Sequence, residues 1–161
     1  MVSQSVWSRL SGQLDAVAAV LADAPEQAIT ARGTDGTWSA HEHIAHLARM
    51  HEVMLDRLRG ILREDGPRLL EYRSEQDAEW PIWAALPPRE VFTRLQALRS
   101  ELLGVVRSLS EAQLRRRATH PTLGPLSVAD WLEAFCLHEG TIFTSPGLGW
   151  QKRKRQLADE F

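Results

Sequence analysis

The stretch WSAHEHIAHLARMHE, Trp38 to Glu52, decides the fold, because it contains both a helix start and a candidate site. Ser39 and Glu42 have the spacing of a capping box, in which the serine hydroxyl accepts from the amide three residues on and the glutamate reaches back. Apolar residues then recur at three- and four-residue steps as far as Ile61, which is typical of one face of a helix. The sequence therefore predicts a helix over about 40–63.

Three further segments have the same helical periodicity. The first spans about 3–24, the next spans about 88–109 and begins at a proline, and the last spans about 127–144 and opens with a second capping box. Four amphipathic helices in a chain of this length predict a single all-α domain over 1–161, folded as a four-helix bundle.

The remaining segments are connections. The one at about 66–87 is long enough to run the length of the bundle and let its flanking helices lie parallel, and Trp80 and Trp83 are expected to anchor it. His120 lies in a turn-rich stretch and is expected to be a loop residue that helps close the last helix onto the core. No segment alternates with strand period over a useful length, and the charged tail at 149–161 is expected to be a short helix or frayed.

Composition excludes several classes of protein. A formal net charge of −2 argues against a general nucleic-acid binder, and we interpret the basic runs at 115–117 and 152–155 as solvated surface. The only cysteine, Cys136, excludes an intrachain disulfide and suits a reducing compartment. No segment approaches the roughly 18 apolar residues of a membrane span, and the first residues do not have the pattern of a signal peptide. We expect a cytoplasmic protein without nucleic-acid or membrane partners.

Histidines supply the candidate site. His46 lies close to the apolar stripe of its helix and is expected to point inward, whereas His41, His43 and His51 are expected at the surface. His138 has apolar neighbours at helical spacing in the last helix and is also expected inward. Bundle metal sites are built from side chains on facing helices, although zinc or nickel normally needs at least three protein ligands. The alternative for each residue is a core histidine with one hydrogen-bond partner.

The stretch WSAHEHIAHLARMHEVMLDRL resembles the DinB/YfiT-like superfamily, whose hallmark is a Trp-Ser start, an early acidic residue and a histidine eight positions after the tryptophan. Trp38, Glu42 and His46 match this pattern. The later stretch THPTLGPLSVADWLEAFCLHEGTI is similar to the C-terminal motif of the same family, in which a His-Pro and Gly loop leads into a Trp-Leu helix with a metal histidine, matched by His138. The resemblance implies a four-helix bundle with up-down-down-up connectivity and, often, a homodimer.

The same resemblance implies a metal site that this chain completes only in part. Many family members hold nickel or zinc through three histidines, and related members are transferases or isomerases that use low-molecular-weight thiols. By this resemblance His46 and His138 are the first two metal ligands, but the third position is Ile142, which cannot coordinate a metal. Glu139 lies about 100° around the helix from His138 and is badly placed to substitute.

Two functions therefore stay open. The first is a bundle with a degenerate metal site that serves as a small-molecule-binding or interaction module, with His46 and His138 as a polar pair in an apolar pocket. The alternative is a divalent-metal-dependent thiol S-transferase or hydrolase that acts on a small substrate. In this case water or an unexpected side chain completes the coordination of the metal ion. A Cys136–His138 dyad is not expected, because the two residues lie about 200° apart on their helix.

Overall fold

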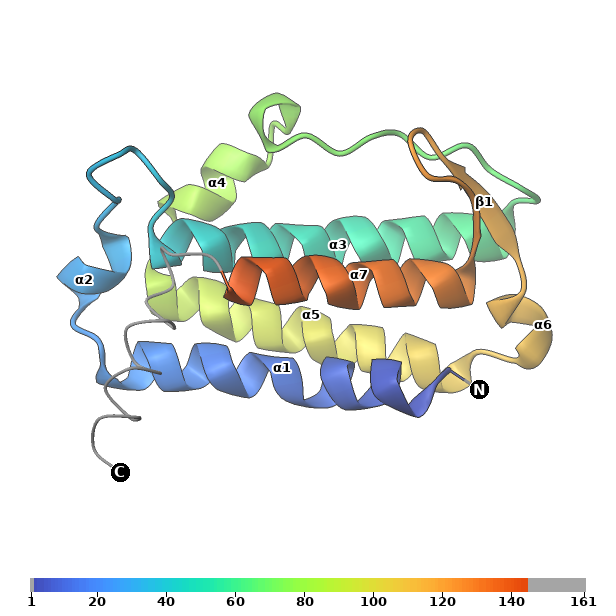
Figure 1. The fold of residues 1–161 in the computed structure, drawn as a ribbon, viewed down its shortest axis with the longest axis horizontal. Coiled ribbons are helices and arrows are strands. Elements are labelled where there is room, and N and C mark those ends of the chain that lie inside the picture. Colours follow the sequence, from blue (N-terminus) through green and yellow to red (C-terminus); the bar gives the residue numbers. More distant parts are fainter. Residues whose placement is uncertain (1, 145–161) are drawn as a thin grey trace.

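The computed structural model describes residues 2–144, so the charged tail expected at 149–161 lies outside the described residues. Within them, four long helices run side by side (Figure 1). Their bounds agree with the predicted ones to within a residue or two: α1 Gln4–Asp23, α3 Ala40–Arg63, α5 Pro88–Ser108 and α7 Val128–Phe143. α1 and α7 run in one direction and α3 and α5 in the other, which confirms a four-helix bundle with up-down-down-up connectivity (Figure 1).

Both predicted capping boxes form. The Ser39 hydroxyl accepts from the Glu42 amide at 3.2 Å, and the Glu42 carboxylate accepts from the Ser39 amide at 2.9 Å. Ser127 and Asp130 make the same two hydrogen bonds at the start of α7. These bonds satisfy amides that the first turn of a helix leaves without a partner, so each helix starts at a defined residue.

Several short elements were not predicted. They are the helical turns α2 Glu26–Thr30, η1 Ser74–Gln76, α4 Trp80–Ala85 and α6 Glu111–Leu114, and the strands β1 Arg117–His120 and β2 Gly124–Ser127. The two strands form an antiparallel hairpin directly before α7, although this stretch shows no alternating strand pattern over a useful length. Strands of four residues are too short to show an alternating pattern, and prolines at 121 and 125 make this stretch resemble a loop.

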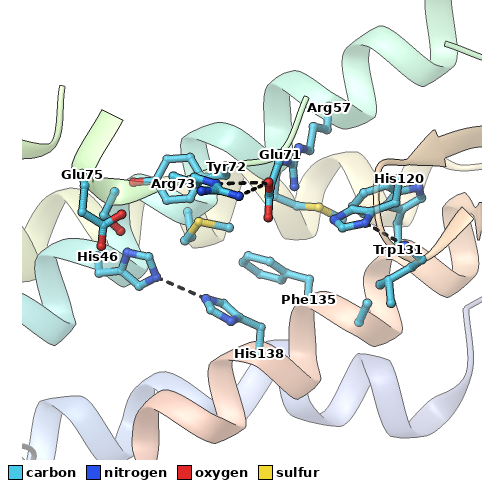
Figure 2. A pocket seen from close by; sticks show the side chains of 15 residues that line it. His46, Arg57, Glu71, Tyr72, Arg73, Glu75, His120, Trp131, Phe135 and His138 are labelled. Atoms are coloured by element: carbon cyan, nitrogen blue, oxygen red, sulfur yellow. Dashed lines mark hydrogen bonds and ion pairs between the residues drawn. The ribbon is translucent and has the colours of Figure 1, made fainter. Parts of the chain in front are cut away.

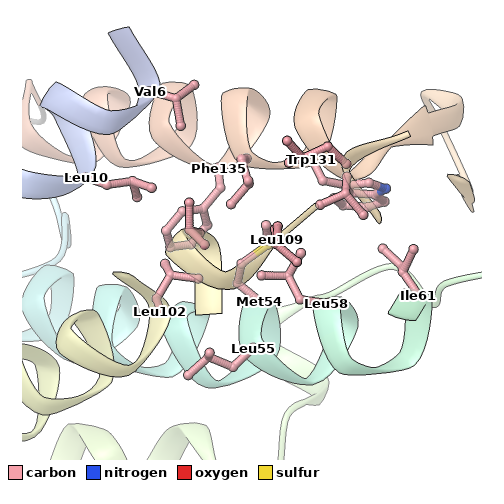
Figure 3. Close-up of a cluster of buried hydrophobic side chains, with 14 of the residues drawn as sticks. Val6, Leu10, Met54, Leu55, Leu58, Ile61, Leu102, Leu109, Trp131 and Phe135 are labelled. Atoms are coloured by element: carbon pink, nitrogen blue, oxygen red, sulfur yellow. The ribbon is translucent and has the colours of Figure 1, made fainter. Parts of the chain in front are cut away.

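The core consists of two apolar clusters. One lies toward the hairpin end and combines side chains of α1, α3, α5 and α7, among them Leu10, Leu58, Leu102 and Phe135 (Figure 3). The other lies toward the start of α3 and includes Leu14, Leu47, Leu95 and Ile142. No helix of the described residues is long and apolar enough to cross a membrane.

Three polar residues, His51 of α3, Arg99 of α5 and Glu139 of α7, form a polar layer. On each of these helices the polar residue lies between the residues of one apolar cluster and those of the other. The exposed fractions of these side chains are 0%, 4% and 0%, so the expectation that His51 lies at the surface is wrong. Arg99 donates from Nε to His51 Nε2 at 2.9 Å and from Nη1 to the Leu10 carbonyl at 2.7 Å, and it forms an ion pair with Glu139. One guanidinium thus links all four long helices.

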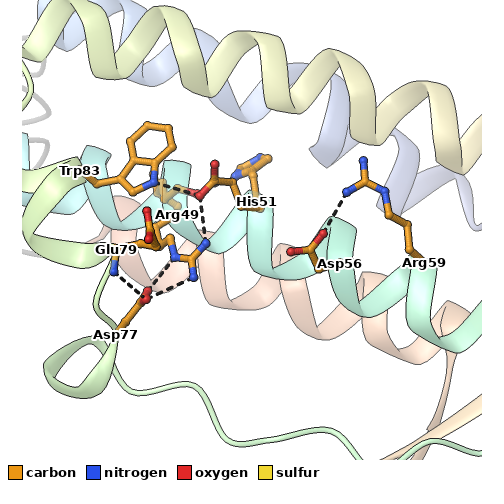
Figure 4. Close-up of polar contacts among 9 residues, drawn as sticks. Arg49, His51, Asp56, Arg59, Asp77, Glu79 and Trp83 are labelled. Carbon is orange, nitrogen blue, oxygen red and sulfur yellow. Dashed lines mark hydrogen bonds and ion pairs between the residues drawn. The ribbon is translucent and has the colours of Figure 1, made fainter.

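The connection between α3 and α5 runs back along the bundle, so the two helices lie parallel (Figure 1). Arg49 of α3 holds it through hydrogen bonds from Nε and Nη2 to the Asp77 carboxylate at 2.6 and 3.2 Å (Figure 4). Trp83 is buried and donates from its indole nitrogen to Glu52 at 2.9 Å, and Trp80 is half-buried. Both tryptophans anchor the connection, as expected.

Candidate functional site

The two histidines that were expected to face each other do so. His46 of α3 and His138 of α7 point their Nε2 atoms at one another at 3.3 Å (Figure 2). His46 is buried and His138 is half-buried. The two residues are 92 positions apart in the chain, and the packing of α3 against the antiparallel α7 brings them together.

Both imidazoles are neutral at neutral pH. Burial lowers the pKa of His46 to about 4, with further lowering by the nearby His138 and His43, and burial also lowers the pKa of His138. Two neutral rings can share one hydrogen bond, in which one Nε2–H donates to the other Nε2. The pair is therefore an uncharged polar spot that can act as donor or acceptor toward a bound molecule.

Aromatic rings surround His46. Trp38 and Trp80 stack on each other with ring centroids 4.9 Å apart, and their centroids lie 5.4 and 6.1 Å from that of His46. Tyr72 lies 5.9 Å from His46 on the same basis, and burial raises its pKa to about 12, which keeps the phenol protonated. Tyr72 was missed by the sequence reasoning, because nothing in the local pattern of the long connection shows which of its residues returns to α3.

The other histidines of the opening stretch have structural roles. His41 is buried and donates from Nε2 to the Ala84 carbonyl at 2.9 Å, so the expectation that it is exposed is wrong. The reason is α4, which covers the first turn of α3 and was not predicted. His43 is half-buried, with its ring centroid 5.6 Å from that of Trp38.

A cavity of about 460 Å³ extends from the histidine pair toward the hairpin (Figure 2). Its α3 wall consists of His46, Met50, Met54 and Arg57, and its α7 wall of Trp131, Ala134, Phe135 and His138. The connection contributes residues 71–75, and the hairpin region contributes His120 and Leu123. His120 packs on Trp131 with centroids 5.4 Å apart, so it contacts the last helix as expected, but it lies in β1 and not in a loop, and it forms part of the cavity wall.

His46 and His138 supply two of the nitrogens that a resident zinc or nickel ion would need. The Nε2 separation of 3.3 Å is close to the roughly 3.4 Å between two nitrogens of one tetrahedral ion. However, residues 2–144 contain no group of three His, Cys, Asp or Glu side chains placed to hold an ion. Ile142 packs in the apolar cluster, and Glu139 belongs to the polar layer. The Nδ1 of His46 is buried and has no hydrogen-bond partner among residues 2–144, although metal-bound histidines normally donate from that nitrogen. The residues do not fit a three-ligand metal site.

Cys136 does not supply a nucleophile. It is buried in the apolar cluster of Figure 3, and burial raises its pKa to about 11, so the thiolate is scarce at neutral pH. This agrees with the expectation that it forms no dyad with His138.

Both the fold and the sequence of this chain are similar to those of known proteins. Among solved structures, the fold resembles that of YfiT from Bacillus subtilis, with a TM-score of 0.78 over 94% of this chain and 90% of that one, at 17% sequence identity. That protein is described as a probable metal-dependent hydrolase with an unusual four-helix bundle topology. A search of curated proteins finds no match. Residues 9–141 match the family model of the DinB superfamily. The chain is therefore a member of the DinB superfamily.

Proposed function

We propose that this protein binds a small molecule in the cavity beside His46 and His138 and that it does so without a resident metal ion. The observation that carries the proposal is the cavity itself, whose volume of about 460 Å³ lies in the range typical of small-molecule sites. Its walls are largely apolar, and the neutral histidine pair provides polar groups at one end. Such a combination orients a ligand without requiring a charge at that end.

The test has two parts. Elemental analysis of untagged protein purified without chelators is expected to show zinc and nickel well below one ion per chain, in the wild type and in His46→Ala and His138→Ala. A thermal-shift screen of small metabolites is expected to find ligands that stabilise the wild type, since a ligand of the folded state raises the unfolding temperature.

A filled cavity provides the control for the screen. Ala134 lines the cavity, so Ala134→Phe is expected to abolish the stabilisation by such ligands. Ala129 is exposed on the same helix, so Ala129→Phe is expected to keep it. Equal stabilisation of the two variants would place the binding elsewhere and contradict the proposal.

A metal-dependent hydrolase, as YfiT is described, or a thiol S-transferase is the second candidate. The observation in its favour is the 3.3 Å separation of the two Nε2 atoms, which suits two ligands of one ion. Near-stoichiometric zinc or nickel in the wild type, lost in both alanine variants, would favour this candidate over the first.

A further inference from the structure

The hairpin end of the cavity, opposite the histidine pair, holds an arginine without a carboxylate partner. Arg57 lies over the ring of Trp131, with its guanidinium carbon 5.3 Å from the ring centroid, and donates to the Leu70 carbonyl at 2.8 Å. Within residues 2–144 no carboxylate lies at ion-pair distance from it. The other arginine of the cavity wall, Arg73, differs because it is paired with Glu71 at 2.8 Å.

Trp131 adds a second unused donor to this end. The tryptophan is only 5% exposed, and its indole N–H is buried without a hydrogen-bond partner in the described part of the chain. A buried N–H without a partner is costly, and native proteins nearly always satisfy such groups. The N–H is closed off from the cavity in this structure, so a ligand atom that accepts a hydrogen bond removes this cost when the ring shifts to meet it.

His120 adds a third donor. Its Nδ1 accepts from the amides of Thr122 and Leu123, both at 3.1 Å. In the neutral ring the proton therefore resides on Nε2, which is a donor. The hairpin end thus combines one guanidinium and two N–H groups, all of which are hydrogen-bond donors. The cavity wall has two acidic residues: Glu71, which is paired with Arg73, and the exposed Glu75.

The middle of the cavity is apolar and elongated. Met50, Met54 and Phe135 line it, and Phe135 lies between His138 and the hairpin end (Figure 2). His46 and Arg57 are eleven residues apart on one straight helix, which corresponds to roughly 16 Å along the axis. A ligand that reaches from one end to the other is therefore a long one.

We propose that the cavity binds an elongated amphipathic oxyanion, such as a carboxylate on an apolar body, with the anionic group on Arg57, Trp131 and His120. The body lies along Met50, Met54 and Phe135 and points toward the histidine pair. This assignment rests on the proposed function, since it names the ligand class of the same cavity. Burial also lowers the pKa of Arg57, with no carboxylate of the described residues to offset it, and a bound anion would supply the missing counter-charge.

Isothermal titration calorimetry of the full chain tests this with octanoate, octanamide and octylamine, which share one alkyl body and differ in head group. Octanoate is expected to bind the wild type at least about tenfold more tightly than octanamide, because a charge-assisted hydrogen bond is stronger than a neutral one. Arg57→Gln is expected to remove that preference, and Trp131→Phe, which keeps the ring but loses the N–H, to reduce it.

Arg94→Gln is the matched control, because Arg94 also lies over a tryptophan ring, that of Trp83 at 5.8 Å, but does not line the cavity. It is expected to keep the preference for octanoate. Inorganic phosphate is measured alongside, and phosphate binding as tight as that of octanoate would contradict an elongated ligand.

Equal affinity for octanoate and octanamide, or an unchanged preference in Arg57→Gln, would overturn the anion assignment while the cavity still binds the amide, so the proposed function would stand. Absence of binding by every alkyl probe to the wild type would overturn the assignment of an amphipathic ligand, and the proposed function would then be decided by the thermal-shift screen with Ala134→Phe. Unchanged thermal unfolding of each variant without ligand shows that the comparison concerns folded protein.

Discussion

Ile142 stands one helical turn after His138, where the family resemblance places a third metal histidine. It is 6% exposed and packs with apolar side chains of α1, α3 and α5. A histidine at this position would complete a three-nitrogen set with His46 and His138, whose Nε2 separation already suits one ion.

We predict that Ile142→His raises the affinity for zinc by a factor on the order of 100, since a third ligand turns a weak site into a defined one. Competition with a zinc indicator measures it. Leu137→His, which adds a histidine to an exposed position of the same helix, is the control and is expected to bind zinc no better than the wild type. No gain in Ile142→His would show that α7 no longer lies at the distance from α3 that a metal requires.

His51 makes stability depend on pH. Its Nδ1 donates to the Leu47 carbonyl at 2.7 Å and its Nε2 accepts from Arg99, so the ring is neutral, and burial together with the Arg99 charge lowers its pKa to about 3. Below about pH 6.5 the His51 imidazole binds a proton in the unfolded chain but stays neutral in the folded chain. The free energy of unfolding should therefore fall between about pH 6.5 and 3, by up to roughly 1.4 kcal/mol per pH unit for this group.

Urea denaturation from pH 7 to 4 is the measurement, and we predict a shallower pH dependence in His51→Gln than in the wild type. Glu139 contributes with the opposite sign, because burial raises its pKa to about 7 and the folded chain then holds the extra proton. The comparison is therefore made in a Glu139→Gln background. Parallel curves for the two proteins would contradict the neutral, buried state of His51.

The polar layer shows which part of the interior the sequence could reveal. His51 falls between Leu47 and Met54 at helical spacing, so the periodicity alone places it in the buried stripe. Its polar side chain argued for the surface instead, and its partners, Arg99 and Glu139, lie 48 and 88 positions away in the sequence, where local spacing says nothing. The inward positions of His46 and His138 were predictable because their helices are long and periodic, whereas the Arg57 end of the cavity was not, because it depends on the hairpin.

At the scale of elements, the segment between α3 and α5 forms one wall of the cavity, and side chains of α3 hold it at several points. Arg49 and Asp77 form a nearly buried ion pair, in which the Asp77 side chain is 10% exposed. Arg49 also donates to Glu52 at 3.0 Å, and that carboxylate accepts from Trp83, so the chain of contacts continues into α4 (Figure 4). The ion pair is therefore one of the polar links between α3 and the connection, beside the hydrogen bond from Arg57 to the Leu70 carbonyl.

We predict that Asp77→Asn increases amide hydrogen exchange in residues 67–79 while the four long helices keep their protection, because it weakens a charge-assisted contact of the wall and not the core. Asp56→Asn is the matched control. Asp56 pairs with Arg59 on the same helix but is 71% exposed, and exposed pairs contribute little (Figure 4). Equal exchange in the two variants would show that the other contacts of the segment, among them those of Trp80, Trp83 and Leu70, suffice to hold the wall.

The long helices were predictable and the short elements were not, for a physical reason. A helix such as α3 repeats its apolar spacing over six turns and begins at a capping box, so many residues support the same prediction of a helix. α4 has only six residues and each strand of the hairpin only four, and these elements are stabilised by the contacts they make with the bundle. Their existence follows from tertiary packing, which a local pattern does not contain.

At the scale of the whole molecule, the polar layer joins all four long helices at one level of the bundle. Desolvating such charges costs free energy that their attraction repays only partly, so a buried ion pair is weak evidence for stability. Its better attested use is to fix how elements align, because only one alignment of the helices lets Arg99 reach His51, Glu139 and the Leu10 carbonyl together.

We predict that Arg99→Met lowers the free energy of unfolding by about 3–5 kcal/mol, because it leaves the Glu139 carboxylate buried without its partner. The triple variant Arg99→Met, His51→Leu, Glu139→Leu is expected to recover most of this loss, since apolar side chains of similar size would join the two apolar clusters into one. Urea denaturation compares the three proteins, and dispersion of the methyl NMR signals reports whether the triple variant keeps a single packing. Recovered stability with broadened signals would mean that the layer sets the alignment of the helices. A triple variant as unstable as the single one would mean instead that the layer is a net source of stability.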